Sequence, residues 1–187
     1  KNGAFYDAEE QPDEGLAIAR MLAHITYLSD QSMGKKFGRA LRFTSEYSYD
    51  LNSEFSVETY LDYQGEQFVN RFDANSYLYI TKAINYFDLG AQFGSLDNAM
   101  KLVQGKTMVL SYSSDWLYPP YKSQQEVEAL TRQKKDVKYC NIQSEYGHDA
   151  FLLEVDVMKK LIGGFLEYVM TPARKGARRQ PFTDSET

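Results

Sequence analysis

Apolar residues recur at helical spacing through the first half of the chain. The segment Pro12-Asp13-Glu14 suits a helix start, because proline fits the first turn and acidic side chains favour the positive end of the helix dipole. We expect a helix from there to about residue 28, with core positions at Leu16, Ala19, Leu22 and Ala23.

Shorter helical patterns follow. Residues 30–55 predict a short helix and then a mobile loop, and Ser56 suits the N-cap of a helix that ends near Gly65. A further short helix is expected over residues 66–71. Asp73 then caps a helix over residues 74–87, whose predicted inward side chains are Leu78, Ile84 and Phe87. Residues 13–88 therefore predict an all-helical block of the kind that forms a lid over another domain.

The pattern changes in the second half of the chain. Residues 89–105 are a connection with several glycines and one expected helical turn. After it come strand-like runs at 107–113 and 137–143, which alternate with helical runs at about 122–134 and 149–170. This β-α-β-α order is typical of the end of an α/β fold with a parallel sheet, and a right-handed crossover places the two strands side by side.

We predict four parts on this basis: a cut N-terminal segment (1–12), a helical lid with its connection (13–105), the C-terminal part of an α/β core (106–171) and a disordered tail (172–187). The chain opens with Lys1 in a polar stretch and has no initial methionine. We therefore expect it to be a piece of a longer protein.

Composition excludes several classes of protein. The net charge of −5 argues against a nucleic-acid binder, which needs a basic face to contact phosphates. No apolar run approaches the roughly 18 residues that span a bilayer. The single cysteine, Cys140, allows no internal disulfide, fits the reducing cytoplasm and suits a small core residue within a strand. Two distant histidines and one cysteine cannot form a zinc site, and we expect no bound metal or cofactor.

Two residues that follow the predicted strands carry candidate chemistry. Asp115 follows the first strand and His148 follows the second, next to Gly147, whose freedom at positive φ suits a sharp turn. Alone, such an aspartate is usually a turn former and such a histidine an ordinary loop residue. Together, and in this order, they match the second and third members of a Ser…Asp…His triad.

The first member of that triad is absent from the sequence. No Gly-x-Ser-x-Gly turn occurs, Ser95 lacks a preceding strand, and Ser113 and Ser114 adjoin the aspartate. We therefore expect the nucleophile, and the oxyanion hole that accompanies it, to come from elsewhere.

A polar stripe on the first helix is a second candidate. Arg20, His24 and Tyr27 lie at i, i+4 and i+7, which places them on one face of the helix. This stripe can be a solvated face with an aromatic edge, or it can line a pocket in which Arg20 binds a carboxylate.

Five separated motifs, over about residues 12–155, resemble the C-terminal half of homoserine O-acetyltransferase, an α/β-hydrolase-fold acyltransferase of methionine biosynthesis. They are Gly15-Leu16-Ala17-Ile18-Ala19-Arg20 with His24-Ile25-Thr26-Tyr27, the run from Val57 to Gly65, the run from Phe68 to Tyr79, Ser114-Asp115-Trp116-Leu117-Tyr118-Pro119-Pro120, and Tyr146-Gly147-His148-Asp149-Ala150-Phe151-Leu152.

The resemblance implies specific roles. Asp115 would be the triad aspartate, His148 the general base, and Asp149 the partner of the homoserine amino group. Arg20 and Tyr27 would reach the substrate from the lid, with Arg20 on the carboxylate, and His24 would be a packing residue. Acetyl-CoA would donate the acetyl group to a serine, and homoserine would then take it. The resemblance also implies a homodimer formed through the lid helices.

The chain departs from this family in lacking the nucleophile and the first strands. We therefore predict that it is inactive alone and needs the missing N-terminal half. The acyl group (acetyl or succinyl) and the acceptor (homoserine, serine or deacetylcephalosporin C) stay open. An esterase of the same fold is a further alternative, and so is a non-catalytic dimerisation role for the helical block.

Overall fold

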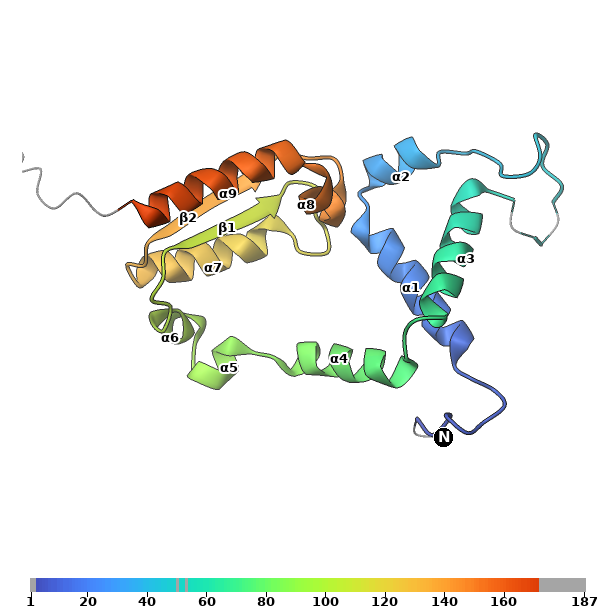
Figure 1. Cartoon of the computed structure of the whole chain (residues 1–187), viewed down its shortest axis with the longest axis horizontal. Coiled ribbons are helices and arrows are strands. Elements are labelled where there is room, and N and C mark those ends of the chain that lie inside the picture. The colour runs from blue at the N-terminus through green and yellow to red at the C-terminus, as the bar shows by residue number, and fades with distance from the viewer. Residues whose placement is uncertain (1–2, 50, 53, 172–187) are drawn as a thin grey trace, which may run out of the picture. The chain divides into compact units, whose positions relative to one another are not determined.

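A computed structural model describes residues 3–49, 51–52 and 54–171 (Figure 1). It divides into two compact units, Lys1–Glu154 and Val155–Thr187. In the second unit the structure describes one helix, α9 (Val155–Met170). The predicted tail at 172–187 lies outside the described residues. Among the described helices, none is both long and apolar enough to cross a membrane.

The expected helical half is helical, apart from one isolated bridge between Leu41 and Phe55. Its helices are α1 (Asp13–Tyr27), α2 (Asp30–Lys36), α3 (Ser56–Val69), α4 (Ala74–Tyr86), α5 (Leu89–Phe93) and α6 (Leu96–Lys101). The helix α1 packs along α3. Asp73 caps α4 as predicted, because its carboxylate accepts a hydrogen bond from the Ser76 amide at 2.6 Å. Two helices, α5 and α6, replace the single turn expected in the connection.

The helix α3 corrects the prediction of a break near Gly65. Gly65 lies inside the helix and is buried, and a Cβ there would lie 3.0 Å from Met21 Cε and 3.1 Å from Ala17 Cβ. The glycine therefore permits the close approach of α1 instead of ending the helix. The predicted N-cap is also shifted by one residue: Phe55 holds that position, and the Glu58 carboxylate accepts hydrogen bonds from the amides of Glu54 and Phe55.

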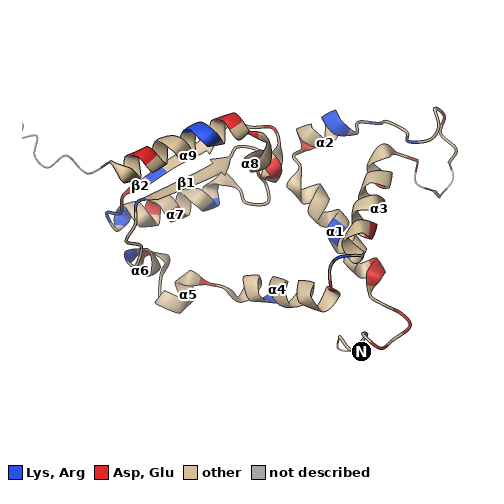
Figure 2. Ribbon diagram, viewed as in Figure 1, with Lys and Arg blue, Asp and Glu red and all other residues tan. Residues whose placement is uncertain are grey.

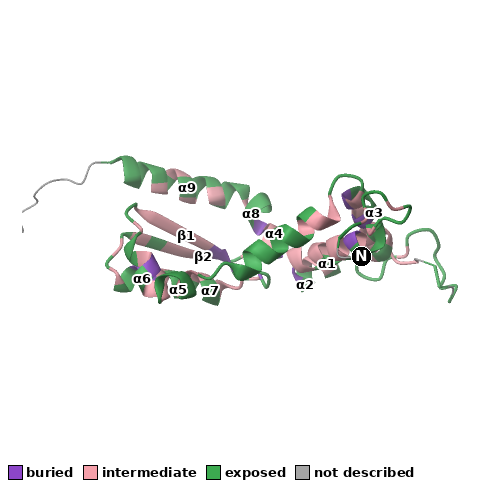
Figure 3. Cartoon of the chain, turned by 90° about the horizontal axis from the view of Figure 1, so that it is seen from below, coloured by how far each residue is buried: buried purple, intermediate pink, exposed green. Residues whose placement is uncertain are grey.

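The prediction of inward side chains on α4 and just beyond it is wrong in this structure. Leu78, Ile84 and Phe87 are exposed by 60%, 65% and 66%, and most of α4 has the colour of exposed residues in Figure 3. On α1, Leu16 is buried as expected but Leu22 is exposed by 60%. Helical spacing shows that an apolar face exists, but it does not show which element covers that face.

The second half contains the predicted parallel pair. β1 (Thr107–Tyr112) and β2 (Val137–Ile142) pair in parallel, with Thr107 opposite Val137 and Tyr112 opposite Ile142. The connecting helix α7 (Pro120–Arg132) packs against both strands and buries Ala129 and Leu130.

The helix predicted over residues 149–170 is interrupted. It begins as a 3-10 turn, η1 (Gly147–Asp149), continues as α8 (Ala150–Leu153), and stops at Glu154 before α9. Glu154 has φ −82° and ψ 47°, which is outside the helical region. Periodicity does not reveal this break, because apolar side chains continue on both sides of it.

Candidate active site

The ends of β1 and β2 bring Asp115 and His148 into contact. His148 Nδ1 lies 2.9 Å from Asp115 Oδ2, across 33 positions of sequence. The aspartate side chain is 6% exposed and the imidazole is 25% exposed. A carboxylate bonded to Nδ1 favours the tautomer with its proton on Nδ1, so Nε2 is left to accept a proton.

Asp115 is also a turn former. Its second oxygen, Oδ1, accepts hydrogen bonds from the amides of Leu117 at 3.0 Å and Tyr118 at 2.8 Å. One oxygen of Asp115 therefore closes the turn, while the other contacts His148. The turn fixes the carboxylate, which fixes the ring of His148.

Position 147 requires a glycine for two reasons: its backbone conformation and the close packing around it. Its φ is 71°, and a Cβ would lie 2.5 Å from the Ser29 backbone nitrogen and 2.7 Å from the Tyr27 carbonyl oxygen. Its amide donates to Ser114 Oγ at 2.9 Å. The turn before His148 thus packs directly on the junction between α1 and α2.

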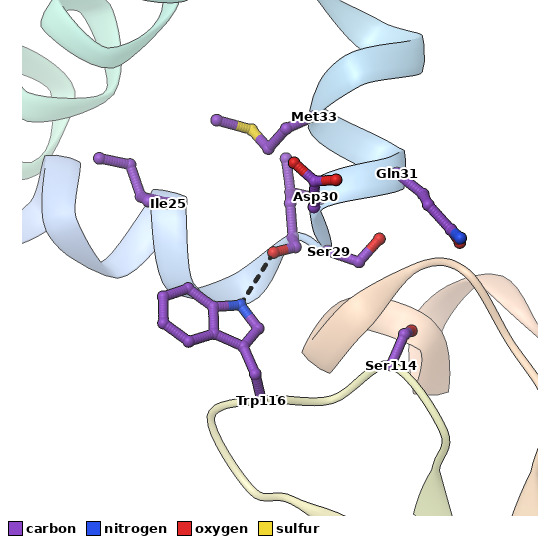
Figure 4. A pocket seen from close by; sticks show the side chains of 8 residues that line it. Ile25, Ser29, Asp30, Gln31, Met33, Ser114 and Trp116 are labelled. Carbon is purple, nitrogen blue, oxygen red and sulfur yellow. Dashed lines mark hydrogen bonds between the residues drawn. The ribbon is translucent and has the colours of Figure 1, made fainter.

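The start of α2 holds the loop that carries His148. The hydroxyls of Ser29 and Ser32 both donate to the carbonyl of Glu145, and Lys35 forms an ion pair with the Glu145 carboxylate. Trp116 Nε1 donates to the Leu28 carbonyl at 3.1 Å, at the side of an open pocket of about 630 Å³ (Figure 4). These contacts join the helical half to both strand-end loops.

Aromatic rings surround the imidazole of His148. The ring centroids of Tyr118, Tyr27 and Phe151 lie 5.1, 5.6 and 5.8 Å from its own. Tyr27 thus lies beside the imidazole of His148, and its contact with a substrate stays a prediction. Tyr118 and Phe151 were not singled out from the sequence, although both belong to the motifs that contain Asp115 and His148.

Arg20 lies seven residues, or about two helical turns, before Tyr27 and is half-buried. Its guanidinium carbon lies 5.0 Å from the centroid of the Phe68 ring and 5.9 Å from that of Tyr27. Its Nε is buried and has no hydrogen-bond partner among the described residues. An Arg held between rings without an acidic partner is suited to bind an anion.

His24 is neutral and packed. Its Nδ1 lies 2.9 Å from the Tyr60 hydroxyl, while its Nε2 is buried without a partner in the described part of the chain. Burial lowers the pKa of His24 to about 4, helped by the positive charges of Arg20, Lys36 and Arg71. Tyr60, which no sequence pattern singles out, has a raised pKa owing first to burial and then to the negative charge of Asp149.

Asp149 follows His148 within η1 and is partly exposed. Its negative charge contributes to the raised pKa of the Tyr60 phenol. Among the described residues, no group of three or more His, Cys, Asp and Glu side chains is placed to hold a metal ion. Within the same residues, the ring of His148 has its only hydrogen bond at Nδ1, and no serine hydroxyl bonds to Nε2.

No family model matches the chain. Among curated proteins, it is 53% identical over 168 residues to a homoserine O-acetyltransferase of Methanosalsum zhilinae, which is 90% of this chain and 34% of that protein. The chain therefore spans about a third of the length of the curated relatives it matches.

Solved structures agree on the fold. A homoserine O-acetyltransferase from Bacillus anthracis matches with a TM-score of 0.76 and 24% identity, over 89% of this chain and 44% of that one. Esterase E22 matches with a TM-score of 0.72 and 26% identity, over 86% and 44%. The chain therefore has part of an α/β-hydrolase fold and, over about 90% of its length, is similar to a third of the length of homoserine O-acetyltransferases.

Proposed function

We propose that this chain supplies the aspartate and histidine of a Ser-Asp-His triad that transfers an acetyl group from acetyl-CoA to the hydroxyl of homoserine, in methionine biosynthesis. The observation that carries the proposal is the hydrogen bond between Asp115 Oδ2 and His148 Nδ1 at the ends of two parallel strands. It leaves Nε2 as the proton acceptor that a nucleophilic serine needs.

The reaction proceeds in two halves. In the first, His148 Nε2 takes the proton of the serine hydroxyl, the serine oxygen attacks the thioester carbonyl, and the CoA sulfur leaves with that proton. In the second, the same nitrogen takes the proton of the homoserine hydroxyl, whose oxygen attacks the acetyl ester. The proton then returns to the serine, which leaves the enzyme unchanged.

The acceptor is a zwitterion, and the site has a group for each charge. We assign the carboxylate to Arg20, which has no acidic partner among the described residues, and the ammonium group to Asp149, beside the base. The Tyr27 ring lies near both the Arg20 guanidinium and the imidazole of His148. Two fixed charges at opposite ends would orient the hydroxyl toward the acetyl group.

We place the nucleophile in the part of the relatives' length that this chain does not span. The chain alone is then inactive, and activity requires the complete enzyme, meaning this chain joined to that upstream part. We propose the reducing cytoplasm as its location, in keeping with the single cysteine.

Hydrolysis is the second candidate, because esterase E22 is among the structural neighbours. In that case water would be the acceptor, and a clamp for an amino acid would have no purpose. The two are separated by thiol release from acetyl-CoA, measured on the complete enzyme with and without homoserine. Strong acceleration by homoserine supports the transferase, whereas an equal rate without it supports the esterase. Substituting succinyl-CoA, or serine as acceptor, tests the related activities.

We also propose that α4 forms a homodimer interface. It has one charged residue, Lys82, within its 13 positions (Figure 2), and exposes Leu78, Ile80 and Ile84 by 52–65%. An uncovered apolar face of this kind usually marks an interface. Sedimentation of the complete enzyme and of its Ile84→Asp variant tests this: the wild type should be dimeric and the variant monomeric, and a monomeric wild type would refute the interface.

A further inference from the structure

Two buried nitrogens on one face of α1 have no partner among the described residues. They are Arg20 Nε and His24 Nε2, one helical turn apart. A buried polar group without a hydrogen bond is costly, so such groups are usually satisfied by a ligand or by another part of the protein. Because the two nitrogens lie on the same stripe, one partner could satisfy both.

The required partner is an acceptor at Arg20, because an arginine Nε always carries a proton. Whether Nε2 of His24 needs an acceptor or a donor depends on the tautomer of the ring. The Tyr60 hydroxyl has Nδ1 of His24 as its only partner in the described structure, at 2.9 Å. If Tyr60 donates, its proton and the Nδ1 lone pair are both satisfied, and the imidazole proton stays on Nε2. If His24 donated instead, the phenolic proton would be left without an acceptor.

The surroundings favour an anion. Arg20, Lys36 and Arg71 all act on His24 with their positive charges, and the ammonium of Lys36 lies 4.2 Å from the centroid of the Tyr60 ring. Of the acidic side chains, Asp149 acts on Tyr60 with its negative charge. A carboxylate has two oxygens and can accept from two donors at once.

We propose that His24 is a second binding residue for the carboxylate of the acceptor, donating from Nε2 while Arg20 donates from Nε, and that Tyr60 is the positioning residue that fixes the His24 tautomer. This inference rests on the proposed amino-acid acceptor. It assigns to His24 a direct contact with substrate, in place of the packing role that the resemblance implied.

The experiment uses the complete enzyme and two analogues that compete with homoserine. One, 4-hydroxybutanoate, keeps the carboxylate and lacks the amino group; the other, 3-aminopropan-1-ol, keeps the amino group and lacks the carboxylate. Inhibition constants for both, together with KM and kcat for homoserine, are measured for the wild type, His24→Phe and His24→Gln. Phenylalanine keeps the ring shape without donors, whereas glutamine places an amide N–H near the position of Nε2.

His24→Phe should raise the KM for homoserine and the inhibition constant of 4-hydroxybutanoate by about tenfold or more, as expected for a lost hydrogen bond to a charged group. It should affect 3-aminopropan-1-ol much less, and His24→Gln should recover most of the loss. Tyr60→Phe should raise the same two constants to a smaller degree, whereas Tyr63→Phe, an exposed tyrosine on the same helix, should not.

Equal weakening of both analogues by His24→Phe, or weakening of neither, would overturn the proposal, because His24 would then serve only packing or an upstream partner. Failure of the proposed acyltransferase function has a different result: the wild type would show no homoserine-dependent release of thiol from acetyl-CoA. Thermal unfolding of each variant confirms that it is folded before its constants are compared.

Discussion

At the scale of single residues, Asp115 performs two tasks with its two oxygens. Oδ1 accepts hydrogen bonds from the amides of Leu117 and Tyr118 and so closes the turn, while Oδ2 forms a hydrogen bond with Nδ1 of His148. The division matters because a substitution can remove one task and preserve the other.

Asp115→Asn is that substitution. Its amide oxygen can still accept the two turn amides, but its amide nitrogen then faces Nδ1 as a donor, which moves the imidazole proton to Nε2. Turnover of the complete enzyme should fall on the order of 10⁴-fold through the wrong tautomer. The melting temperature should change little. A large loss of stability together with modest loss of turnover would show that the turn is the main task.

The lowered pKa of His24 predicts that the stability of the protein depends on pH. Its pKa in the folded protein is about 4, below the ordinary value of 6.5, so the unfolded chain takes up this proton at higher pH than the folded one. The contribution of His24 to stability is therefore complete above about pH 6.5, is lost as the pH falls toward 4, and changes no further below that.

The check is the urea midpoint of the complete enzyme at pH 7 and pH 5, with His24→Gln as the control that cannot titrate. The wild type should lose more stability than the variant between the two values. Equal losses would mean that His24 is protonated as readily in the folded state as in the unfolded state.

At the scale of elements, the N-terminus of α2 positions the loop that carries His148. Ser29 caps α2, because its hydroxyl oxygen accepts a hydrogen bond from the Ser32 amide at 3.0 Å. The same hydroxyl also donates a hydrogen bond to the Glu145 carbonyl. One short helix thus connects the helical half of the chain to the loop that carries His148.

Ser95 provides a matched control, because it caps α6 in the same way, with the Asn98 amide 3.1 Å from its hydroxyl, far from Glu145 in sequence. Ser29→Ala and Ser95→Ala should each cost about 1 kcal/mol of stability as lost caps. Only Ser29→Ala should also lower kcat of the complete enzyme. Equal kcat in the two variants would show that the Ser29–Glu145 contact does not position His148.

The elements also show what local sequence can reveal. The order of β1 and β2 followed from alternating patterns, and with it the meeting of Asp115 and His148. The Ser29–Glu145 and His24–Tyr60 contacts join polar residues 116 and 36 positions apart, and such pairs leave no periodic signal. Gly65 looked like a helix end because its close contact with α1 depends on tertiary packing.

At the scale of the whole molecule, the site is composite. The described residues hold the proposed base, His148, with the carboxylate of Asp115 and the proposed acceptor-binding groups, but none of their serines bonds to Nε2 of His148. The relatives are about three times as long as this chain. We therefore propose that the reacting hydroxyl comes from the upstream part of the complete enzyme.

Peptide mass analysis of the complete enzyme after brief exposure to acetyl-CoA tests this claim most directly. A single acetyl group should appear on a serine upstream of this chain, disappear when homoserine is added, and fail to form in His148→Ala. Acetylation of a residue within this chain, or an unchanged label in His148→Ala, would contradict the account.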